Sequence, residues 1–107
     1  MTTFDKRREG YESKFARDEE LRFRALARRN KLLGLWAAEK LGKSGDDAQA
    51  YAREVVRADM QEVGDEDVFH KIRTDFDAAG VAQSDHQIRR TMDDLVVEAV
   101  AQIEAGT

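Results

Sequence analysis

The fold is decided by residues 19–42, which read EELRFRALARRNKLLGLWAAEKLG. Apolar residues recur in this stretch at steps of three and four, the spacing that places side chains on one face of an α-helix. The resulting stripe consists of Leu26, Leu33, Ala37 and Leu41. Leu32 and Trp36 lie beside the stripe, and we expect Trp36 to anchor the core. Because Gly42 can end a helix, the pattern predicts an α-helix over residues 19–41.

Three further helices are predicted, because no later segment alternates cleanly as a strand would. The first of them is expected to run from about Gly45 to Glu62, and Ser44 with Asp47 resembles a capping pair at its start. Its apolar face consists of Ala48, Tyr51, Ala52, Val55 and Val56, with Met60 at the edge. This face predicts an amphipathic helix that packs against the first one.

The next helix is predicted over residues 66–79, where apolar residues again repeat at steps of three and four. Asp65 is placed to cap its first turn. At its other end, Gly80 can adopt the left-handed conformation. Val81 is then placed to contact Phe76, as a Schellman stop requires.

The last helix is predicted to open at Ser84, because Ser84 and Gln87 have the spacing of a capping box. Its buried stripe is expected to consist of Ile88, Met92, Leu95, Val96, Ala99 and Ile103. Short turns join the four predicted helices, which favours antiparallel neighbours. The expected fold class is therefore all-α, a small four-helix bundle with a flexible N-terminal segment.

The composition excludes several classes of chemistry. The chain has 107 residues, which suits one domain, and it contains no cysteine and no proline. Without cysteine there is no disulfide scaffold, thiolate zinc site, iron–sulfur cluster or thiol nucleophile. The longest strictly apolar run covers residues 35–38, whereas a membrane-spanning helix needs about 20. We therefore expect no direct membrane insertion.

Charge is distributed unevenly along the chain. Residues 1–31 hold ten Lys/Arg against six Asp/Glu, whereas residues 32–107 hold eight against sixteen. The basic residues that are expected to form a positive front on the first helix are Arg22, Arg24, Arg28, Arg29 and Lys31. Nucleic-acid binding needs a broad basic face, so the acidic remainder argues against it. The alternative is that this front contacts acidic helices of the same bundle.

Residues 1–18 differ from the rest, since they contain three large apolar side chains among nine charged ones. Such a segment is too polar to fold alone. Phe4, Tyr11 and Phe15 nevertheless fall on one stripe if the segment is helical. One interpretation is an arm that becomes an amphipathic helix in a partner's groove. The other is that the stripe packs on its own bundle, and the residues alone do not separate the two.

Several apparent chemical signals have simpler structural explanations. Gly42-Lys43-Ser44 matches the end of a phosphate-binding loop, but a helix rather than a strand precedes it and the first glycine is missing. His70 and His86 lack the partners of a metal site, and the acidic clusters at 65–67 and 93–94 suit solvated faces. With no catalytic constellation and no cofactor motif, we expect a binding protein rather than an enzyme.

Two segments carry a family resemblance. They are residues 14–23, KFARDEELRF, and residues 27–38, ARRNKLLGLWAA, and two shorter stretches at 41–48 and 64–69 agree with them. Together they strongly resemble the zeta subunit of alpha-proteobacterial ATP synthases, a family also known as a domain of unknown function. The likeness covers essentially the whole chain from Phe4 onward.

The resemblance implies an inhibitor of ATP hydrolysis by the catalytic F1 sector. Residues 1–18 would be a mobile inhibitory arm that enters an interface between catalytic and non-catalytic subunits, and residues 19–107 would be the bundle. The positions carried over are Phe4, Asp5, Arg8, Phe15, Asp18, Glu19, Glu20 and Leu21, with Tyr11 added as the third aromatic residue of the stripe. The implied location is cytoplasmic, peripheral to the inner membrane through the ATP synthase.

A competing hypothesis is an adenine-nucleotide-sensing module. A cleft between helices would then bind ADP or ATP weakly, near arginines such as Arg89 and Arg90. No phosphate-cradling motif supports this alternative.

Overall fold

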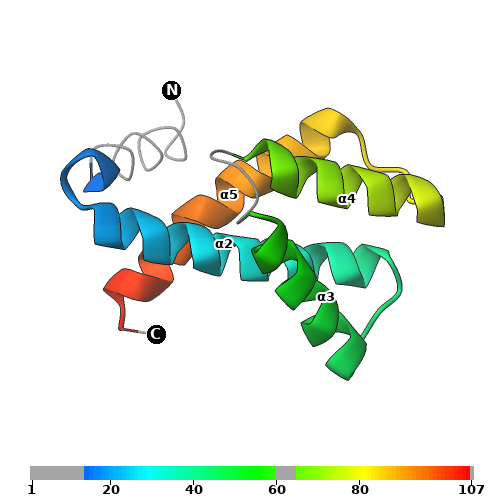
Figure 1. Cartoon of the computed structure of the whole chain (residues 1–107), viewed down its shortest axis with the longest axis horizontal. Coiled ribbons are helices and arrows are strands. Elements are labelled where there is room, and N and C mark those ends of the chain that lie inside the picture. Colours follow the sequence, from blue (N-terminus) through cyan, green and yellow to red (C-terminus); the bar gives the residue numbers. More distant parts are fainter. Residues whose placement is uncertain (1–13, 60–64, 107) are drawn as a thin grey trace.

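The computed structural model describes residues 14–59 and 65–106, which are all-helical and contain no strand (Figure 1). The helices are α2 (Glu19–Lys40), α3 (Gly45–Ala58), α4 (Glu66–Ala79) and α5 (Asp85–Glu104). Residues 14–17 form a further helical segment, separated from α2 by the extended backbone of Asp18. The all-α class is therefore confirmed, whereas the count of four helices was not exact.

Helix α2 is the centre of the arrangement. It packs on both α3 and α5, and α4 contacts α3 and α5 in turn. The closest approach is at Gly34, where an added Cβ would lie 2.5 Å from Cα of Ala52 on α3. Glycine costs about 1 kcal/mol of helix stability relative to alanine, but here it allows two helix backbones to touch.

The apolar side chains form two clusters at different points along α2. The larger one contains Leu33, Ala37, Ala38, Tyr51, Val55, Val68, Phe69, Ile72, Phe76, Ile88 and Met92. Trp36 packs against it from its edge, half-buried, with its ring centroid 5.6 Å from that of Phe76. The smaller cluster contains Ala25, Val96 and Val100, with Phe15, Leu26 and Ile103 packed against it. The predicted stripes of α2 and α5 supply part of both clusters, but they omitted Ala25, Ala38 and Val100.

Two predicted helix boundaries were wrong in detail. Helix α3 ends at Ala58 rather than near Glu62, because Asp59 caps it and hydrogen-bonds to Asn30 on α2. The side chain of Ser44 makes no capping hydrogen bond. Gly45 enters α3 with φ 54, whereas an ordinary capping box continues with helical dihedrals.

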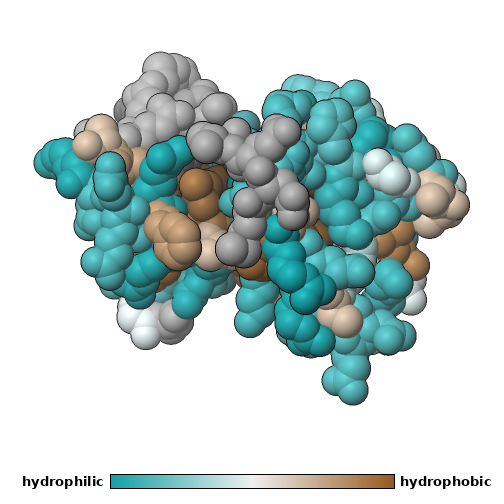
Figure 2. All heavy atoms as spheres, in the orientation of Figure 1, coloured by the Kyte–Doolittle hydropathy of each residue, from teal (hydrophilic) through white to brown (hydrophobic). Residues whose placement is uncertain are grey.

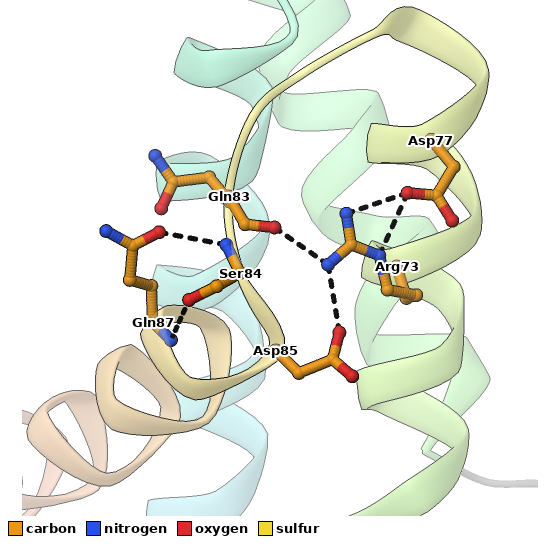
Figure 3. Close-up of polar contacts among 6 residues, drawn as sticks. All are labelled: Arg73, Asp77, Gln83, Ser84, Asp85 and Gln87. Atoms are coloured by element: carbon orange, nitrogen blue, oxygen red, sulfur yellow. Dashed lines mark hydrogen bonds and ion pairs between the residues drawn. The ribbon is translucent and has the colours of Figure 1, made fainter.

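The turn between α4 and α5 agrees with the sequence prediction. Gly80 has φ 70, and the N–H of Val81 donates to the carbonyl of Phe76 at 2.9 Å, which completes a Schellman stop. Ser84 and Gln87 form the reciprocal capping box, with hydrogen bonds of 2.9 and 3.1 Å (Figure 3). Local sequence was sufficient to predict both of these ends.

Arg73 ties this turn to α4 (Figure 3). Its guanidinium donates to Asp77 on the same helix, to the carbonyl of Gln83 at 2.7 Å and to Asp85 at 3.0 Å. The hydrogen bonds that its guanidinium donates to Asp85 and Asp77 raise the pKa of Arg73. The start of α5 is thus held by a permanent charge as well as by its cap.

The contact at Gly34 gives a stability prediction. Gly34→Ala should lower the free energy of unfolding by about 1–3 kcal/mol, because the new methyl group meets the backbone of α3. The measurement is urea unfolding followed by circular dichroism at 222 nm. Helix propensity alone would instead make this variant about 1 kcal/mol more stable, and that result would contradict the close packing.

Two control variants sharpen this test. Lys40→Ala, at an exposed position of the same helix, should stay within about 0.5 kcal/mol of the wild type. Adding Ala52→Gly to Gly34→Ala should restore little stability, since the nearest atom is Cα of Ala52 rather than its side chain.

Candidate functional site

The described base of the arm packs on the bundle. Phe15 is half-buried against the smaller apolar cluster, which joins α2 to the C-terminal part of α5. Beside it, Nζ of Lys14 lies 2.6 and 2.8 Å from the two carboxylate oxygens of Glu104, near the end of α5. For Phe15, the structure therefore agrees with the second interpretation of the aromatic stripe, packing on its own bundle.

Asp18 is the break between the arm and α2. Its backbone is extended (φ −141, ψ 94), and Oδ1 accepts a hydrogen bond from the N–H of Leu21 at 3.0 Å. Glu19 and Glu20 occupy the first turn, where negative charge complements the helix dipole. These junction residues thus have a capping role in the free protein, and their contact with a partner stays a prediction.

The structure covers only part of the predicted contact surface. Phe15 and residues 18–21 are described, whereas Phe4, Asp5, Arg8 and Tyr11 lie outside the described residues. Glu19 and Glu20 are exposed, and Leu21 is half-buried. The described residues are therefore adjacent to one another at the junction of arm and bundle.

A buried polar cluster lies in the middle of α2. Arg29 was expected on the positive front, but it is only 1% exposed. Its Nε donates to Oδ1 of Asn30 at 2.7 Å, and its Nη2 lies 2.8 Å from Oδ1 of Asp65. Asp65, expected to cap α4, makes no capping bond and is half-exposed beside Arg29. Leaving a buried guanidinium without a partner costs more free energy than leaving a helix start without a cap. This explains why Arg29 is absent from the positive front and why Asp65 does not cap α4.

The position of Arg29 in the sequence indicated that it is buried, although a count of charges along the chain does not show this. Arg29 falls three residues after Leu26 and four before Leu33, so it occupies the apolar stripe itself. A charged residue at a stripe position indicates either a break in the pattern or a buried ion pair. Periodicity could have identified Arg29, but not its distant partner Asp65.

Asp59 faces the same cluster. Its pKa is raised, chiefly because burial disfavours the charged carboxylate, while the hydrogen bond from Asn30 and the charge of Arg29 oppose the shift. Nearby, Oδ2 of Asp67 is buried and has no hydrogen-bond partner in the structure. The carboxyl groups of Asp59, Asp65 and Asp67 thus outnumber the one guanidinium, that of Arg29, among the described residues of this cluster.

An open groove runs along the outer face of α2. Its volume is about 920 Å³, and Phe23, Lys31 and Leu35 line it together with Val56 of α3 and Ile103 of α5. Phe23 is 77% exposed, which is unusual for a phenylalanine. Figure 2 shows apolar side chains reaching the surface over the N-terminal half of α2, bordered by hydrophilic ones.

The arginines considered for nucleotide binding do not converge. The guanidinium of Arg89 forms 3.0 Å contacts with both carboxylate oxygens of Glu66 and lies 4.0 Å from the ring centroid of Phe69. These hydrogen bonds raise the pKa of Arg89 and lower that of Glu66. Arg90 is exposed and one position further around α5. Arg89 is therefore already engaged in tying α5 to α4.

The Gly42-Lys43-Ser44 segment is a turn between two helices. Gly42 has φ 78 and ends α2, as predicted. A small pocket of about 410 Å³ opens beside it, lined by Lys43, Tyr51 and Lys71 among others. Lys71 is paired with Asp75 at 2.9 Å, and Asp75 accepts a hydrogen bond from the Tyr51 hydroxyl at 2.7 Å. Burial raises the pKa of Tyr51, so its hydroxyl stays protonated.

The histidines are placed as surface residues. His70 is exposed, with Nε2 3.9 Å from Oε2 of Glu66, and His86 is exposed in the first turn of α5. Within residues 14–59 and 65–106, no three potential His, Cys, Asp or Glu ligands lie close enough to hold a metal ion. None of the helices in these ranges is both long and apolar enough to cross a membrane.

Comparison with known proteins decides the family. The model of a family described as ATPase inhibitor subunit zeta matches residues 1–102. The chain belongs to the ATPase inhibitor subunit zeta family. This confirms the resemblance expected from residues 14–38. Members of this family are regulatory subunits, and membership implies an interaction with the F1 sector of ATP synthase.

A solved structure supports the same assignment. A solution NMR structure is 47% identical in sequence and superposes with a TM-score of 0.73, covering 81% of this chain and 99% of the other. No curated protein matches the chain. The zeta-subunit fold is thus shared by a relative whose structure was determined independently.

The buried ion pair gives a second prediction. Asp65→Ala should lower the free energy of unfolding by about 1–3 kcal/mol, because it leaves the Arg29 guanidinium buried with one acceptor fewer. Arg29→Met in the Asp65→Ala background should recover part of this loss, since it removes the unpaired charge. A double-mutant cycle from urea unfolding measures the coupling, and purely additive effects would show that the two side chains do not interact.

A third prediction concerns pH. The raised pKa of Asp59 means that folding favours its protonated form, so the ionised carboxylate destabilises the native state at neutral pH. Asp59→Asn should therefore be more stable than the wild type at pH 7, by less than about 1 kcal/mol because the group is partly solvated. This advantage should vanish below the ordinary carboxyl pKa of about 3.9.

The measurement for Asp59 is urea unfolding of both proteins at several pH values from 3 to 8. Asp94→Asn, which neutralises an exposed carboxylate on α5, is the matched control and should show no comparable gain. An Asp59→Asn variant that is less stable than the wild type at pH 7 would contradict the burial argument.

Proposed function

We propose that this chain inhibits ATP hydrolysis by the F1 sector by inserting residues 1–18 at an interface between catalytic and non-catalytic subunits. Residues 19–107 would form the bundle that carries this arm. The observation that supports the proposal is that the family match begins at residue 1 and so includes the arm. The protein would act in the cytoplasm, peripheral to the inner membrane through the ATP synthase.

The junction of arm and bundle supports this mechanism. Residues 14–17 are already helical, and only the extended backbone of Asp18 interrupts the path into α2. If residues 4–41 became one helix, it would be about 57 Å long at 1.5 Å per residue. The chain contains no proline to prevent such a helix. An arm of this length would reach deep into a partner and block rotation there.

The arm would bind through its aromatic stripe and its charges. Phe4 and Phe15 would be the anchors, with Tyr11 between them, and Asp5 and Arg8 would contribute polar contacts. Asp18, Glu19, Glu20 and Leu21 would meet the rim of the interface where the arm joins the bundle. Ordering the arm costs conformational entropy, which these contacts must offset.

Adenine-nucleotide sensing is the alternative. The pocket beside Tyr51 offers Lys43 and Lys71, but Glu54 and Asp75 also line it, so the four charges cancel. A phosphate chain would need a net positive site, and Arg89 is engaged with Glu66. Amide shift changes during titration with ADP or ATP would support this alternative, and they should be absent if the protein is a pure protein-binding inhibitor.

The decisive test measures ATP hydrolysis by the isolated F1 sector. The intact chain should inhibit it, whereas a chain lacking residues 1–13 should lose at least tenfold in potency. This deletion keeps Phe15 and the Asp18 cap, so the described bundle is retained. Equal inhibition by the two proteins would show that residues 1–13 are not the inhibitory element.

A pair of aromatic variants provides a matched control in the full chain. Phe4→Ala should weaken inhibition, because it removes a proposed anchor. Phe23→Ala removes the same side chain from an exposed site on α2 and should leave inhibition unchanged. A loss of inhibition in Phe23→Ala alone would instead place the contact on the groove of the bundle.

A further inference from the structure

Phe15 has two alternative binding surfaces, one on its own bundle and one in the proposed mechanism. In the free protein it packs on the cluster formed by Ala25, Val96 and Val100. In the mechanism proposed above, the same ring is an anchor that meets the F1 sector. One face of an aromatic ring cannot occupy both sites, so binding to the ATPase must compete with packing on the bundle.

We propose that the contact of Lys14 and Phe15 with the C-terminal end of α5 is an autoinhibitory latch that holds the arm back until it engages the ATPase. This inference rests on the proposed function, since it concerns how the same arm is regulated. The latch is built from two different interactions. Phe15 contributes apolar packing, and Lys14 contributes an ion pair to Glu104 at 2.6 Å.

The latch has the properties of a reversible contact. Phe15 is only half-buried, and the side chains of Lys14 and Glu104 are 41% and 49% exposed. Water and salt screen an ion pair at such an exposed site. The ion pair therefore helps to orient the arm but stabilises the contact only weakly. A partner that offers a deeper apolar site for Phe15 can therefore displace it.

Asp18 supplies the hinge for this release. In the closed form, the N–H of Leu21 bonds to the Asp18 side chain, while the N–H of Asp18 bonds to the carbonyl of Lys14 at 3.0 Å. The N–H of Arg22 already bonds to the Asp18 carbonyl at 3.1 Å, as it would within an uninterrupted helix. If Asp18 became helical, Leu21 would exchange its cap for the carbonyl of Arg17. Opening thus exchanges one hydrogen bond for another at a single residue.

The first test weakens the latch from the bundle side, which leaves the arm unchanged. Glu104→Gln removes the negative charge opposite Lys14 and should lower the protein concentration needed for half-inhibition of isolated F1 by two- to fivefold. Asp94→Asn makes the same type of change at an exposed position of α5 and should have no effect. Unchanged potency in Glu104→Gln would show that the ion pair has no part in holding the arm.

The second test locks the latch. The chain has no cysteine, so Lys14→Cys with Glu104→Cys gives one unique pair that a short bismaleimide can bridge. The bridged protein should need at least tenfold more protein for half-inhibition than either single-cysteine variant treated with the same reagent. Full inhibition by the bridged protein would overturn the latch while leaving the proposed function intact.

A readout without the ATPase separates the two proposals. In the free protein, release of Lys14 and Phe15 should let residues 14–17 unfold, because this segment is too polar to fold alone. Hydrogen exchange at the Asp18 amide, which donates to the carbonyl of Lys14, should therefore be faster in Glu104→Gln than in the wild type or in Asp94→Asn. Equal exchange in the three proteins would overturn the latch directly. If exchange responds as expected but no variant inhibits F1, the proposed function is wrong, and the regulatory role of the contact fails with it.

Discussion

A buried guanidinium in the central helix is the constraint around which the middle of this molecule is organised. Arg29 lies between the two apolar clusters and is almost fully excluded from water. An unpaired charge there would cost several kcal/mol, so the chain must bring oxygen acceptors to it. Asn30 supplies one from α2 itself, and Asp65 supplies another from the start of α4. The start of α4 is thus tied to the middle of α2 by this ion pair.

This constraint also shows where sequence analysis reached its limit. The stop at Gly80 and the capping box at Ser84 were predicted correctly, because residues within a few positions of each end determine them. Asp65 was predicted to cap α4 by the same local logic, and that prediction failed because Arg29, 36 residues away, competes for the carboxylate. Distant polar partners such as Asp65 cannot be deduced from spacing.

For the arm, the sequence left open which surface Phe15 packs on. An aromatic stripe at helical spacing predicts that Phe15 packs on something, but spacing does not say on what. The structure answers this for the free protein, since the smaller cluster on α2 and α5 accepts the ring. The family match implies an interaction with the F1 sector, which composition could never have named. Four of the nine predicted contact residues precede residue 14 and lie outside the described residues, so the fold could be compared with its prediction more fully than the site.

The two ends of the bundle differ in how firmly they are tied. At the turn between α4 and α5, Arg73 and the capping box make several short hydrogen bonds, and Arg89 ties α5 back to α4. At the arm, the contacts of the described residues include a half-buried ring and an exposed ion pair.

Release of the arm should therefore need less free energy than unfolding of the whole bundle. Exposed ion pairs contribute about 0–1 kcal/mol, and full burial of a phenylalanine about 1.5–3 kcal/mol. Domains of this size are stable by about 5–15 kcal/mol. Release of the arm therefore costs a fraction of the global stability, as expected of a local opening. In the proposed mechanism, the bundle would therefore remain folded while the arm exchanges one apolar site for another.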